Sequence, residues 1–62
     1  MKNTLQVGQK VHIDTDNKEW GRVASDATVI STHRLDALLE VESIRANILV
    51  RYRDIDVREK HV

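Results

Sequence analysis

The chain has 62 residues, no cysteine, and ten basic residues balanced by ten acidic ones. This length allows one domain with a small core, because a chain of about 60 residues buries only about 60% of its unfolded surface. The lack of cysteine excludes disulfides and thiolate metal sites. The charge balance argues against strong non-specific binding to nucleic acid, which depends on neutralising phosphates.

We expect neither a membrane span nor a signal peptide. No apolar run approaches the roughly 20 residues of a membrane-spanning helix, and residues 1–10 contain no apolar signal segment. We therefore expect a cytoplasmic protein. Its predicted organisation is a flexible arm over residues 1–6, one domain over residues 7–58 and a charged tail over residues 59–62.

Alternation of apolar and polar residues predicts a first strand after the arm. Val11 and Ile13 face one side of this strand, whereas Lys10, His12 and Asp14 face the other. A strand with this pattern is buried on one face only. We therefore expect the two apolar residues in the core and the three polar residues on the surface.

Residues 15–18 supply turn chemistry, because Asp and Asn side chains bond nearby backbone and tolerate left-handed geometry. A second strand is expected from Trp20 to Val23. Gly21 favours a bulge or sharp bend there, since it lacks a side chain. The β-branched segment 27–30 is expected to continue the sheet.

The segment 31–36 has no clear periodicity and predicts either a loop or a short helical turn near residues 32–38, capped by Ser31 or Thr32. Leu39 and Val41 then alternate with outward glutamates, which predicts a third strand. Residues 44–47 have the length of a hairpin loop, with Asn47 able to adopt a positive φ.

The last third predicts two further strands. Apolar residues at 48, 50 and 52 alternate with residues 49, 51 and 53, and the simplest register places Glu40 opposite Arg51. A tight turn over residues 54–56 then leads into a short strand from Val57.

A helix is the alternative for residues 37–55, because apolar residues in this range also lie three or four positions apart, as on a helix face. We favour strands because residues 48–52 are rich in β-branched and aromatic side chains.

Four short motifs resemble SH3-like small barrels, including KOW-type modules and the C-terminal domain of retroviral integrases. They are VGQKVHI (7–13), WGRV (20–23), LLEVE (38–42) and ILVRYRDIDV (48–57). Such barrels share a glycine-led first strand, a second strand with tryptophan or glycine, a charged hairpin and a short turn before the last strand. The resemblance implies a mostly-β, closed, SH3-like barrel of about five strands. Residues 24–37 form an insertion relative to the KOW pattern.

No residue pattern is typical of an enzyme or metal site. The histidines at positions 12, 33 and 61 match no zinc spacing, and two aromatic residues are too few for a methyl-lysine cage. Ser25 beside Asp26, and Ser31 near His33, fit turn chemistry better than a nucleophile site. We expect no catalytic residue, no metal, no cofactor and no small-molecule substrate.

The first functional hypothesis is a non-enzymatic interaction module that binds a protein partner or self-associates. Its candidate contacts are Trp20, Ile44 and Leu49. Ile44 and Leu49 are expected to be exposed, and Trp20 either caps the core or lies exposed as an anchor. The alternative is a nucleic-acid-binding module. Its candidate contacts are the basic residues Lys10, Arg22, Arg45, Arg51 and Arg53. We favour protein binding, because acidic residues stand close to these cations in the sequence.

Overall fold

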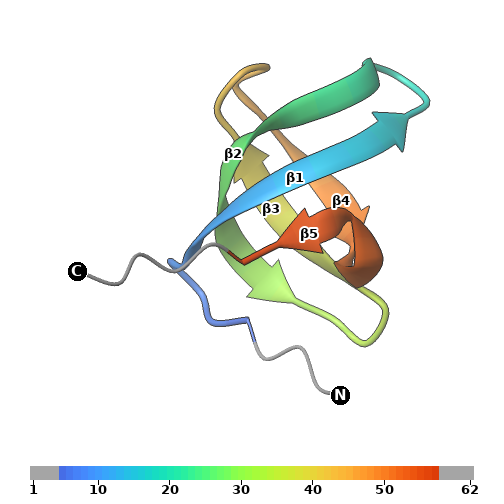
Figure 1. Ribbon diagram of the computed structural model, residues 1–62. Coiled ribbons are helices and arrows are strands. Elements are labelled where there is room, and N and C mark those ends of the chain that lie inside the picture. The colour runs from blue at the N-terminus through green and yellow to red at the C-terminus, as the bar shows by residue number, and fades with distance from the viewer. Residues whose placement is uncertain (1–4, 58–62) are drawn as a thin grey trace.

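The computed structural model describes residues 5–57, which form one antiparallel sheet. Its elements are β1 (Lys10–Asn17), β2 (Gly21–Thr32), β3 (Asp36–Val41), β4 (Ala46–Arg51), the 3-10 turn η1 (Tyr52–Asp54) and β5 (Ile55–Asp56). The strand order is β4-β3-β2-β1-β5, and the sheet is strongly curled (Figure 1). The prediction of a mostly-β fold with five strands is confirmed, and the helical alternative for residues 37–55 is wrong.

The hairpin of β1 and β2 follows from the chemistry of its turn. The side-chain oxygen of Asn17 accepts hydrogen bonds from the backbone N–H groups of Glu19 (2.7 Å) and Trp20 (3.0 Å). Gly21 lies opposite Asn17 and adopts a φ of 75°, a conformation that side chains disfavour. The predicted Asx turn is therefore present, and Gly21 closes it instead of forming a bulge within the strand.

β2 is a single strand of twelve residues that pairs with β1 along its first part and with β3 along its second part. A register shift between Val29 and Ser31 marks a bulge, and β2 bends between its two neighbours (Figure 1). Most of the predicted insertion 24–37 is therefore strand. Only residues 33–35 form the connection to β3.

The hairpin of β3 and β4 has a different register from the predicted one. Glu40 lies opposite Asn47, and Arg51 lies opposite Asp36, so the predicted Glu40–Arg51 pair is wrong. The turn comes two residues earlier than expected, over residues 42–45, and Arg45 rather than Asn47 has the positive φ, at 51°. The position of this turn sets the whole register, because every pair shifts with it.

The helical turn and the last strand also lie elsewhere than predicted. Residues 33–35 form a bend, where the His33 N–H donates to the Asp36 carbonyl at 2.8 Å. The one-turn 3-10 helix is η1, at residues 52–54, where the sequence predicted strand for residues 52 and 53 and the start of a tight turn at Asp54. β5 begins at Ile55 and pairs with His12 and Ile13 of β1. The predicted tight turn at 54–56 and strand from Val57 are therefore wrong by two residues.

The sheet is not closed, so the predicted closure is wrong. Within residues 5–57, β4 pairs with β3 and β5 pairs with β1, and no pairing joins β4 to β5. η1 turns the chain away from β4 before β5 begins, and β5 has only two residues. The gap leaves β4 as a sheet edge of six residues.

The core is formed by the alternate side chains of four strands, as the alternation predicted. Its buried apolar members are Val11, Ile13, Val23, Ala27, Val29, Ala37, Leu39, Val41, Ile48 and Val50. Tyr52 packs against this cluster and donates its hydroxyl hydrogen to the His33 carbonyl. It was predicted in the core and is half-buried at its margin.

The N-terminal segment joins the sheet at Gly8, which has a φ of 91° and donates its N–H to the Val29 carbonyl at 2.7 Å. Leu5 packs against the core. The predicted arm reaches into residues 1–4, which lie outside the described residues, as does the predicted tail with His61. None of the described residues belongs to a helix long and apolar enough to span a membrane.

Candidate interaction surface

The outer face of β3 and β4 carries a pair of leucines. Leu38 and Leu49 lie directly opposite each other, and each alternates with buried residues of its strand. Leu49 is 57% exposed although it lies in the middle of a regular strand. A single exposed leucine is common on protein surfaces. Leu49 differs in that it lies on an edge strand of the sheet, where a second chain can reach both its side chain and the neighbouring backbone.

Polar residues flank the leucine pair on both sides. Asp36 lies opposite Arg51 toward one end of the strands, and Glu40 lies opposite Asn47 toward the other. An apolar centre with a polar rim is the usual anatomy of a protein interface. We call Leu38, Leu49 and these four flanking residues the β3–β4 surface.

β4 itself is the longer of the two edge strands. It contains no lysine, proline or acidic residue, and its pairing with β3 is regular over all six residues. Natural edge strands usually carry such residues or bulges, which discourage pairing with another chain. Among residues 5–57, no strand pairs with the outer edge of β4, so β4 presents an unprotected edge whose one charged residue is Arg51.

The structure does not bring the three predicted protein-contact residues together. Trp20 was predicted either to cap the core or to be exposed. It lies in the β1–β2 turn and is 46% exposed, so the second alternative is found. Ile44 was predicted to be exposed, but it is partly buried, because the β3–β4 turn packs it against the core. Only Leu49 lies on the β3–β4 surface.

Two of the five predicted nucleic-acid contacts are engaged in ion pairs. Lys10 lies 3.2 Å from the carboxylate of Glu42. Arg22 makes two hydrogen bonds to the Asp14 carboxylate, at 3.0 and 2.9 Å. These bonds lower the pKa of Asp14 and raise the pKa of Arg22. Phosphate groups would have to compete with these carboxylates.

The other three predicted cations lie in different elements and do not form one row. Arg45 is in the β3–β4 turn, Arg51 ends β4 and Arg53 is in η1. All three side chains are exposed. The predicted strand carrying both Arg51 and Arg53 is therefore wrong, because β4 ends at Arg51.

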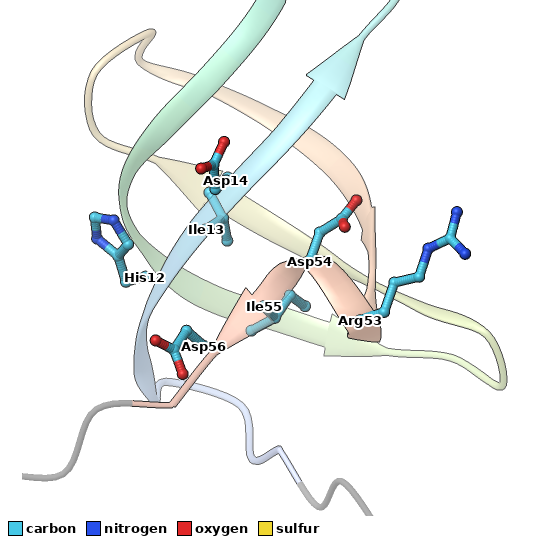
Figure 2. A pocket seen from close by; sticks show the side chains of 7 residues that line it. All are labelled: His12, Ile13, Asp14, Arg53, Asp54, Ile55 and Asp56. Carbon is cyan, nitrogen blue, oxygen red and sulfur yellow. The ribbon is translucent and has the colours of Figure 1, made fainter.

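An open depression of about 370 Å³ lies between β1 and the η1–β5 segment. Ile13 and Ile55 are paired at its centre, and Asp14, Asp54 and Asp56 surround them (Figure 2). Figure 2 shows His12 and Arg53 pointing away from each other at opposite ends, so the polar groups do not converge on one point. Among residues 5–57, no group of three His, Cys, Asp or Glu residues is arranged to hold a metal ion.

The serines considered as possible nucleophiles have structural contacts. The Ser25 hydroxyl donates to the Asp26 carbonyl at 2.9 Å and accepts the Ser43 N–H at 3.1 Å. These bonds join β2 to the β3–β4 turn. The Ser31 hydroxyl lies 3.2 Å from the ring nitrogen Nε2 of His33. Of the β3–β4 surface, Leu49 and Arg51 were among the contact residues predicted from the sequence. Leu38, Asp36, Glu40 and Asn47 were not, because their proximity to Leu49 and Arg51 depends on the register of β3 and β4.

Comparison of the chain with models of protein families, with curated proteins and with solved structures found no match.

Proposed function

We propose that this protein is a non-enzymatic interaction module that binds another polypeptide chain at β4. The observation that carries the proposal is an unprotected edge strand with an exposed leucine at its centre. An edge strand presents backbone N–H and C=O groups that an added strand can bond, and side chains at alternate positions supply specificity. Leu49 and its neighbour Leu38 supply the apolar contact in this arrangement.

The arrangement of the elements supports an SH3-like fold for the module. A long, bent β2 serves both halves of the sheet, and a 3-10 turn leads from β4 into a short β5 beside β1. This order resembles the small barrels named above. The likeness concerns architecture and assigns no binding residue by itself.

Nucleic-acid binding is the alternative function, and the charges favour it less. Lys10 and Arg22 are paired with carboxylates, and the formal net charge of the chain is zero. The affinity of proteins for nucleic acid comes largely from phosphate neutralisation by unpaired cations, which release counterions. Arg45, Arg51 and Arg53 are dispersed over three elements and offer no continuous basic track.

Site-directed photo-crosslinking tests the proposed binding surface. A photoreactive phenylalanine analogue at position 49 is expected to form a covalent adduct with a polypeptide, either another protein or a second copy, when the protein is irradiated in cells. The same analogue at Ala24, which is exposed on β2 away from the β3–β4 surface, is the matched control. Equal yields at positions 49 and 24 would contradict the proposal.

A binding assay at two salt concentrations separates the alternatives. We expect a labelled single-stranded oligonucleotide of about 20 nucleotides to bind weakly, and the double variant Arg51→Gln/Arg53→Gln to bind it no differently. Tight binding that falls by a factor of about 10 or more between 50 and 200 mM salt, and is lost in the double variant, would favour the nucleic-acid function.

A further inference from the structure

We infer that the strand added to β4 is β4 of a second copy of this chain, paired antiparallel about a two-fold axis at Leu49. This inference rests on the proposed function and names the partner at the same surface. Three properties of the described residues support the inference: the length of β4 compared with β5, the side chains that each register would bring together, and the charges along β4.

β4 is the edge with enough length to pair. The other edge, β5, has only two residues, whereas β4 has six in regular pairing with β3. The features that usually block edge pairing, namely lysine, proline, inward charge and bulges, do not occur in β4. Its inward residues Ile48 and Val50 are apolar, so both faces of an added strand would meet apolar side chains.

The side chains of β4 favour one symmetric register. In an antiparallel pair of strands, opposite residues point to the same face of the sheet. A two-fold axis between two copies of β4 must therefore pass beside one residue, which then lies opposite its own copy. Centring the axis on Leu49 places the two exposed leucines against each other, with Leu38 of each copy on the next strand. Centring it on Ile48 or Val50 would instead place Leu49 opposite Asn47 or Arg51 of the second copy.

The charges are compatible with the leucine-centred register. Asn47 then lies opposite Arg51 of the second copy, so the β4 ladder contains no pair of like charges. Within each copy, Arg51 remains beside Asp36 on β3. The chain carries no formal net charge, so two copies approach without long-range repulsion. The outer face of the ten-stranded assembly would have the apolar row Leu38, Leu49, Leu49 and Leu38 at its centre.

The interface is small, because it consists of one strand and its immediate neighbours. Interfaces that bury less than about 1,200 Å² belong to weak or transient complexes. We therefore expect dissociation constants in the micromolar range and a reversible monomer–dimer equilibrium. Sedimentation velocity of the full chain between about 5 and about 500 μM should show a rise from monomer to dimer.

Disulfide trapping tests the register directly, because the natural chain has no cysteine. Leu49→Cys is expected to form a covalent dimer under mild oxidation at least about 10-fold faster than Leu35→Cys, since pairing raises the effective concentration of the thiols. Leu35 is 66% exposed and lies outside β4, which makes it a matched control. Asn47→Cys and Arg51→Cys should each dimerise slowly alone and rapidly when mixed with each other.

Each outcome of this experiment decides the inference. Rapid trapping of Leu49→Cys and of the mixed pair supports it. Asn47→Cys trapping as fast alone as in the mixture would overturn the register, and equal rates for Leu49→Cys and Leu35→Cys would overturn self-pairing. If self-pairing fails while the photoreactive group at position 49 still captures a different protein, the proposed function stands and only the identity of the partner is wrong. All substituted positions are exposed, so the variants should fold.

Discussion

The hydroxyl of Thr15 on β1 donates a hydrogen bond of 2.9 Å to carboxylate oxygen Oδ2 of Asp54 in η1. This partly buried bond joins residues 39 positions apart and holds the η1–β5 segment beside β1. It therefore helps to direct the chain from β4 to the opposite edge of the sheet. The open edge of β4 depends on that path.

Replacing Thr15 by valine should weaken this connection without changing the shape of the side chain. The expected loss is about 1–2 kcal/mol in the free energy of unfolding, because a partly buried carboxylate loses a donor. Thr15→Ser keeps the hydroxyl and should retain more of the stability. Urea denaturation of both variants measures the difference, and equal losses would show that the bond does not matter.

Two leucines on neighbouring strands should respond very differently to truncation. Leu39→Ala should cost about 2–5 kcal/mol, because Leu39 is fully buried, whereas Leu49→Ala should change stability by no more than about 0.5 kcal/mol. A domain of this size is marginally stable, so a loss at the upper end of this range abolishes folding, and Leu39→Val provides a milder test of the same position. Equal effects at positions 39 and 49 in chemical denaturation would contradict the assignment of the two faces.

Gly21 should be sensitive to substitution through its backbone conformation alone. A Cβ at this position would meet no atom within 4 Å, but its φ of 75° disfavours side chains. We expect Gly21→Ala to lower the free energy of unfolding by about 1 kcal/mol. Gly21→Asn should cost less, since asparagine is enriched in left-handed conformations. Thermal unfolding of both variants measures the order, and a more stable alanine variant would contradict it.

The ion pair of Asp14 and Arg22 predicts a defined response to acid. The pKa of Asp14 is lower in the folded chain than in the unfolded chain, because Arg22 donates two hydrogen bonds to the carboxylate. The pair therefore adds stability above the unfolded pKa of about 3.9, and this contribution is lost as the pH falls through the lower folded pKa. Both side chains are exposed, so the contribution is small and falls with salt.

NMR titration of the side-chain carboxyls measures this effect. Arg22→Gln should raise the pKa of Asp14 toward its ordinary value, whereas Lys10→Gln, which removes a cation paired with Glu42, should leave it unchanged. A pKa of Asp14 that does not respond to Arg22→Gln would show that the two groups are not paired in solution.

Burial explains which parts of the fold the sequence could predict. Alternation along β1, β3 and β4 correctly assigned the inward residues Val11, Leu39 and Val50, because each strand has one buried face. The continuous β2 was missed, since Ser25 and Asp26 read as a break between strands. They fit within the strand because the Ser25 hydroxyl has two backbone partners, one of them on the distant β3–β4 turn.

The register of β3 and β4 and the open edge could not be predicted in this way. Asparagine at position 47 was the better candidate for a positive φ, but Arg45 adopts it, and that choice shifts every cross-strand pair. The gap between β4 and β5 depends on η1, whose residues also fit a strand pattern. Leu49 was identified from its outward position, whereas its pairing with Leu38 required the register.

The central claim is that two copies of this protein meet at β4, and a dilution series of ¹H–¹⁵N spectra tests it most directly. Between about 1 mM and about 10 μM, we expect concentration-dependent amide shifts in residues 46–51 and in Leu38, with small changes elsewhere. Leu49→Lys should abolish these shifts, whereas Leu35→Lys should preserve them. Spectra that do not change with concentration, or shifts centred on Trp20, would contradict the claim.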